Sequence, residues 1–182
     1  MSSIFRFTIA TLFLSGVSPI FAADDAEFIF NVTVPKNTCN IIIEGTSINK
    51  VDFGSVPLKR LASDANNGNI KKPFQVKLSN CKNTNFSGNY LKISGNYVND
   101  GFLDSPEGKD FAIRISDKDG AKASDNVFFA NDSKIWTNIT ANNMNKTFYT
   151  YVMCKKGVAD CSTKTENLGQ FKSTITITYF AD

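Results

Sequence analysis

The sequence predicts an all-β fold, a sandwich or a barrel, from two patterns. Apolar and polar residues alternate with a period of two in several segments, for example residues 74–78 and 111–115, which is typical of half-buried strands. Clusters of Asn, Asp and Gly, such as residues 117–120, separate these segments as turns. No segment keeps a 3.6-residue period for three turns, so at most a single helical turn is expected, at residues 57–65 or 144–146.

The first 22 residues have the pattern of a secretory signal. Arg6 precedes an apolar stretch at residues 7–14, and Gly16 and Pro19 precede small residues. Cleavage after Ala22 would leave about 160 residues, enough for a single domain. The alternative is a membrane anchor, but the apolar stretch is about half the ~20 residues that a spanning helix needs.

The two ends of the expected mature chain are predicted strands. At the N-terminal end, the alternating residues of 26–34 share one apolar face. At the C-terminal end, residues 171–180 place apolar side chains on one face and Thr or Ser on the other. A chain that ends in a strand needs a partner for that strand, because an open edge favours aggregation.

The four cysteines predict two disulfide bonds. An exported protein enters an oxidising compartment, where an even number of cysteines indicates bridges. Three pairings are possible, and we expect Cys39 with Cys81 and Cys154 with Cys161. Cys39 and Cys81 each lie beside an apolar segment, and the six residues between Cys154 and Cys161 contain Lys-Lys-Gly, which is typical of a hairpin turn. A zinc site of four thiolates is the alternative, and the absence of any C-x-x-C pair argues against it.

The composition excludes several classes of function. The chain has no histidine, so it can hold no Ser-His-Asp or Cys-His catalytic group and no histidine-ligated zinc. Its formal charge of +3 comes from scattered lysines rather than a basic stripe, so no nucleic-acid partner is expected. No paired carboxylates can be placed together from the sequence. We therefore expect neither an enzyme nor a cofactor.

Several short motifs, taken in order, make the sequence resemble a known family. They are the alternating extension at 28–34, Cys39-Asn-Ile-Ile, Val51-Asp-Phe-Gly-Ser-Val56, the strand ending in Cys81, residues 111–120, residues 148–152 and residues 169–179. Together they resemble the subunits of chaperone-usher pili, such as the type 1 and P pili of Gram-negative bacteria. The resemblance covers essentially the whole expected mature chain.

The resemblance implies an incomplete immunoglobulin-like β-sandwich that lacks its final strand, with an N-terminal donor-strand extension. Residues 1–22 would be the signal, 23–37 the extension and 38–182 the pilin domain. In such families a periplasmic chaperone fills the open groove, and at the outer-membrane usher the extension of the next subunit replaces it by strand addition. The donor residues would be Phe28, Phe30, Val32 and Val34, and the groove would include Phe171, Ile175, Ile177 and Tyr179 of the C-terminal strand.

The implied function is that of a structural subunit of a surface fimbrium involved in cell adhesion, reached by export to the periplasm. Two departures from the family pattern favour a minor subunit (adaptor, tip or terminator) over the shaft pilin. Val32 stands where the donor extension usually carries a glycine, seven residues before the cysteine. The Cys154–Cys161 bridge is also unusual for the family.

Some of these features have other interpretations. The extension could be an ordinary first strand of its own sheet. The protein could be a one-domain adhesin that binds a host glycan or protein, with Trp136 beside Phe128 and Phe129 as a stacking platform, although a lone Trp in a sandwich is more often part of the core. Residues 117–120 are expected to form a hairpin turn rather than a calcium loop.

Overall fold

The structure, a computed structural model, describes residues 25–33, 39–82, 86–98, 101–105, 108–155, 158–163 and 169–181. The expected signal at 1–22 and the predicted donor residue Val34 lie outside the described residues. Among the described residues, no helix has the length and apolar character needed to cross a membrane.

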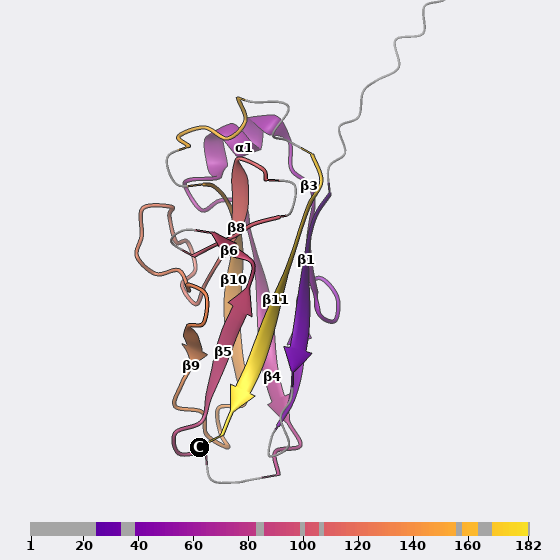
Figure 1. Cartoon of the computed structure of the whole chain (residues 1–182), viewed down its shortest axis with the longest axis vertical. Helices are drawn as coiled ribbons and strands as arrows, with labels where there is room; N and C mark the ends of the chain where they lie inside the picture. The colour runs from indigo at the N-terminus through magenta and orange to yellow at the C-terminus, as the bar shows by residue number, and fades with distance from the viewer. Residues whose placement is uncertain are drawn as a thin grey trace, which may run out of the picture.

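Two β-sheets form a sandwich, which confirms the predicted all-β class (Figure 1). The first sheet has the order β3 (Lys50–Ser55), β1 (Asp25–Thr33), β11 (Phe171–Phe180), β5 (Tyr90–Gly95) and β9 (Lys134–Trp136). The second has the order β2 (Asn40–Glu44), β4 (Lys71–Ser79), β10 (Asn145–Cys154), β8 (Phe111–Ser116), β7 (Phe102–Leu103) and β6 (Tyr97–Val98). The core lies between the sheets, and in strands such as β2, β4 and β11 it takes the inward side chain of every second residue.

Strand β8 departs from the predicted half-buried pattern, because all six of its residues are buried. The segment after it folds back over its outer face. The Phe129 N–H donates to Ile115 O (2.9 Å), and the Ser116 hydroxyl donates to Val127 O (2.8 Å). The guanidinium of Arg114 lies 3.7 Å from the centre of the Phe128 ring. This irregular cover has no periodicity that the sequence pattern could reveal.

The single described helix, α1 (Leu58–Asp64), follows Pro57 and buries Leu61 against the core. It confirms the helical turn expected at 57–65. Proline is common at the start of a helix, because its missing N–H would have no partner there. The second expected position, residues 144–146, is wrong: β10 begins there, and Asn145 pairs with Lys77 of β4.

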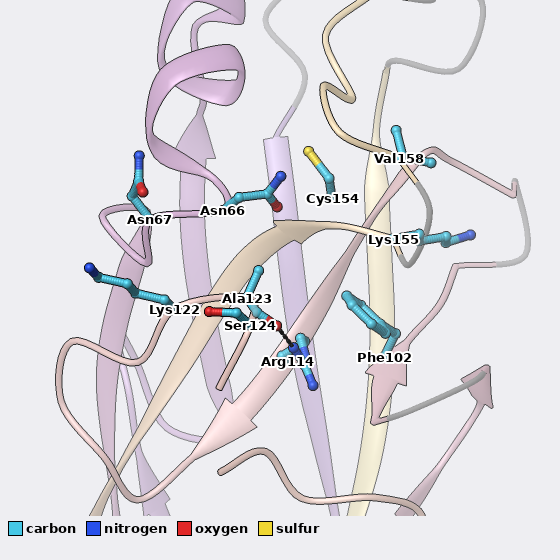
Figure 2. Close-up of a pocket in the computed structure, with 10 residues that line it drawn as sticks. All are labelled: Asn66, Asn67, Phe102, Arg114, Lys122, Ala123, Ser124, Cys154, Lys155 and Val158. Carbon is cyan, nitrogen blue, oxygen red and sulfur yellow. Dashed lines mark hydrogen bonds between the residues drawn. The ribbon is translucent and has the colours of Figure 1, made fainter. Parts of the chain in front are cut away.

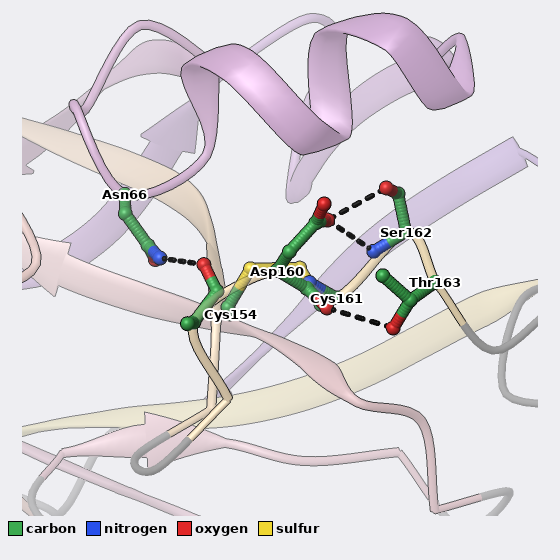
Figure 3. The surroundings of a disulfide bond; sticks show 7 residues. Asn66, Cys154, Asp160, Cys161, Ser162 and Thr163 are labelled. Atoms are coloured by element: carbon green, nitrogen blue, oxygen red, sulfur yellow. Dashed lines mark hydrogen bonds between the residues drawn. A yellow bond between two sulfur atoms is a disulfide. The ribbon is translucent and has the colours of Figure 1, made fainter.

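Both predicted disulfide bonds are present. Cys39 and Cys81 flank the paired strands β2 and β4. Figure 3 shows how Cys154, at the end of β10, is joined to Cys161. The amide of Asn66 donates to Ala159 O (3.0 Å) in the segment that this bridge closes. Hydrogen bonds from Ser162 to Asp160 lower the pKa of that carboxyl and complete the turn.

Candidate functional site

Strand β1 lies inside the first sheet, between β3 and β11 (Figure 1). It runs antiparallel to β3 and parallel to β11. No strand follows β11 in the described part of the chain, so the place beside it is filled from the N-terminal end. Its inward residues lie in register with inward residues of β11: Phe28 with Ser173, Phe30 with Ile175, and Val32 with Ile177.

Three of the four predicted donor residues therefore face this chain's own core. Phe28 is 0% exposed and Phe30 is 3% exposed, while Val32 is half-buried. The Phe30 ring lies 4.8 Å from that of Phe28 and 4.8 Å from that of Phe74, on the opposite sheet. Burial of each ring contributes about 1.5–3 kcal/mol. The two aromatic side chains are thus the main anchors of the strand.

The predicted groove residues of β11 also face the core together. Phe171, Ile175, Ile177 and Tyr179 are all buried, and the Tyr179 hydroxyl accepts a hydrogen bond from the amide of Asn89 (2.7 Å). Burial raises the pKa of Tyr179, and the Asn89 bond lowers it in part. The sequence reasoning missed Ser173, which is buried on the same face; its odd-numbered position in the alternation could have revealed it.

A small charge network holds the outer face of the strand. Glu27 lies between Lys50 of β3 (3.7 Å) and Lys172 of β11 (4.0 Å). Asp52 accepts a hydrogen bond from Gly54 N–H (2.7 Å), and this bond is the main cause of its lowered pKa. Most of these charged side chains are at least a third exposed. Each ion pair therefore contributes only about 0–1 kcal/mol to stability. The free energy of holding β1 comes mainly from its inward face.

The position between β3 and β11 in the first sheet can hold only one strand at a time. In the structure the occupant is the chain's own first strand, as in the alternative interpretation of the extension. Its donation to a neighbouring subunit is a separate hypothesis. If β1 left, the inward side chains of β11 and the backbone edges of β3 and β11 would lose their cover.

Two other candidate features carry no ligand-binding geometry. Trp136 is 2% exposed, so it belongs to the core and cannot stack on a sugar at the surface. Residues 117–120 form a turn, and the Asp117 carboxylate pairs with Lys146 (3.0 Å). No group of three or more metal-ligating side chains occurs among the residues that the structure describes.

A surface depression of about 510 Å³ lies between β8, the end of β10 and the segment after α1 (Figure 2). Two of its three cationic side chains already have protein partners: Arg114 donates to Ala123 O (2.9 Å), and Lys155 pairs with Asp104 (2.6 Å). We therefore assign it no ligand.

One comparison with known proteins bears on the pairing of β1 with β11. The family described as "Fimbrial: Fimbrial protein" matches residues 28–179, a span that runs from the first anchor of β1 almost to the end of β11. The comparison with curated proteins gave no match.

Proposed function

Because the chain belongs to the fimbrial protein family, and hence to the proteins that make up surface fimbriae, we propose that it joins its fibre by donor-strand exchange. In this mechanism β1 leaves its own groove and fills that of a neighbouring subunit, and another subunit's strand fills the vacated groove. The observation that carries the proposal is the burial of Phe28 and Phe30 beside β11. This chain's own groove holds these side chains, which supports the expectation that a similar groove in a neighbouring subunit accepts them.

The covalent structure allows β1 to leave. Both disulfide bonds lie C-terminal to it, the first beginning at Cys39. Strand β1 is therefore outside every disulfide loop and can be withdrawn without breaking a covalent bond. The domain from Cys39 onward keeps both of its bridges.

The groove would then need a new occupant. Residues 175–180 of β11 still pair with β5 after β1 leaves, whereas residues 171–174 pair only with β1. Unpaired strand edges beside exposed apolar side chains favour aggregation. This requirement supports a periplasmic chaperone and an outer-membrane usher as partners, in addition to the neighbouring pilus subunits that the family implies.

The remaining parts of the proposal concern export and place in the fibre. Residues 1–22 would direct the chain to the periplasm, and the extension at 23–37 would precede the pilin domain at 38–182. Val32 lies opposite Ile177 and is half-buried, so a valine at this position fits this groove. We propose a minor subunit, because a groove made for glycine at this position would not accept it.

A disulfide lock tests the exchange. Thr176 of β11 lies between Asn31 of β1 and Ser94 of β5 in the register of the sheet. The Asn31→Cys/Thr176→Cys variant would fix β1 to its own groove, and neighbouring strands are close enough for such a bridge. The variant is produced in the bacterium that carries the gene, and its amount in sheared surface fibres is measured after mass spectrometry confirms the bridge.

The matched control is Ser94→Cys/Thr176→Cys, which shares one cysteine but locks β11 to β5. Donor-strand exchange predicts that the β1-locked chain is missing from the fibres, while the control enters them. Equal incorporation of the two locked chains would overturn the proposal.

A further inference from the structure

The contact between β1 and β11 includes one unusual pairing of a large and a small side chain. Four of the five inward residues of β11 are large: Phe171, Ile175, Ile177 and Tyr179. The fifth is Ser173, and it lies in register with Phe28, which is 0% exposed.

Hydrogen bonding does not account for a serine at this position. Ser173 is 3% exposed, and its hydroxyl has no hydrogen-bond partner among the described residues. A buried hydroxyl without a partner lowers stability. The small size of the side chain does account for it, because interiors are close-packed and the Phe28 ring needs space on the facing strand.

An aromatic contact also fixes the Phe28 ring. Phe30 packs edge-on against Phe28 at 4.8 Å, and Phe30 itself packs against Phe74 of β4, whose ring stacks on Phe148 of β10. These rings form a continuous wall from the strand to the second sheet. The Phe28 ring, which faces Ser173, is therefore connected through Phe30 to residues of the second sheet.

We propose that Ser173 is the specificity-determining residue of the groove, and that it selects a strand with a large aromatic side chain where Phe28 lies. The partner would be an extended segment of this kind, and β1 of a second copy of this chain fits the description. The inference rests on the proposed strand exchange. A strand with a small residue there would leave a cavity, whereas a large residue at position 173 would overfill the space.

The first experiment measures unfolding of the chain without its expected signal, residues 23–182. Phe28→Ala and Ser173→Leu should each raise the unfolding equilibrium constant at least tenfold. In the double variant the leucine fills the space of the ring, so the two effects should not add and at least tenfold of the loss should be recovered. Phe30→Ala combined with Ser173→Leu is the control and should show no recovery, because Phe30 faces Ile175.

The second experiment measures the choice of strand. The same chain, carrying Phe30→Ala so that its own β1 competes less well, is unfolded in denaturant with its disulfides intact and refolded with an excess of labelled peptide of residues 25–34. Retained peptide is counted after electrophoresis in detergent without heating. The parent chain should retain the unchanged peptide at least tenfold more than its Phe28→Ala version. Ser173→Leu should reverse this preference, and Ser173→Ala should keep it, since size rather than the hydroxyl decides.

The outcomes separate the two proposals. Equal retention of both peptides by the parent chain overturns the role of Ser173 and leaves strand exchange standing. Retention of neither peptide by any variant overturns strand acceptance itself, and the selectivity with it. If Ser173→Leu does not fold, Ser173→Val takes its place in both experiments, and a preference unchanged by valine counts against the inference.

Discussion

Phe30 of β1 lies in parallel register with Ile175 of β11, and both side chains are almost completely buried although they come from opposite ends of the sequence. The pairing joins the first described strand to the last one. The free energy of this contact determines how readily β1 leaves its groove.

Phe30→Ala should lower the free energy of unfolding by about 3–5 kcal/mol, because it removes a buried ring and leaves a cavity beside Phe74. Urea unfolding monitored by circular dichroism measures the loss. Asn31→Ala is the matched control on the outer face of the same strand, where the side chain is exposed, and should change stability by less than about 0.5 kcal/mol. Equal losses for the two variants would contradict the inward placement of Phe30.

The two disulfide bonds should differ in their contribution to stability. Replacing Cys39 and Cys81 by alanine should cost about 4 kcal/mol, because that bridge closes a loop of 42 residues. The same change at Cys154 and Cys161 should cost about 2 kcal/mol, since the separation there is 7. Denaturant midpoints of the two double variants give the comparison, and a larger loss from the shorter loop would contradict it.

Tyr179 should make the fold sensitive to alkaline pH. Its pKa is raised by burial, so its contribution is complete below the ordinary tyrosine pKa of about 10 and is lost as the pH rises through the folded value. Tyr179→Phe should flatten this alkaline loss while costing about 0.5–1.5 kcal/mol at neutral pH, because the bond from Asn89 is gone. Thermal unfolding between about pH 8 and pH 11 tests it, and an unchanged pH slope would count against the assignment.

Asp52 should contribute in the opposite pH range. Its pKa is lowered, first by the Gly54 N–H and then by Lys50, so its stabilisation is present above the ordinary carboxyl pKa and is lost as the pH falls through the folded value. Asp52→Asn should therefore lose less stability than the parent chain between about pH 5 and pH 2. The difference should stay below about 1 kcal/mol, because the side chain is more than a third exposed. Parallel acid titrations of the two chains, followed by fluorescence, measure it.

The sequence was sufficient for the parts of the fold that depend on local pattern. Alternation located β4 and β11, and the cysteine positions predicted both bridges. Alternation also placed Phe28, Phe30 and Val32 on one face. It could not show which groove they fill or in which direction, because the same alternating face fits a neighbour's sheet and the chain's own.

The parts that could not be predicted depend on tertiary contacts. Ser173 was overlooked because serine is usually exposed, and its burial follows from the ring that faces it. The cover over β8 comes from a segment without periodicity. Residues 145 and 146 joined strand β10 because pairing with β4 outweighed a weak local preference for helix.

Electrophoresis of sheared fibres in detergent, with and without heating, tests the central claim most directly. Donor-strand exchange predicts that this chain runs in unheated samples as species of high mass that also contain other fimbrial subunits, and that heating converts them to the monomer. A chain that runs as a monomer in unheated samples, while the other subunits of the same fibres remain in high-mass species, would contradict the account.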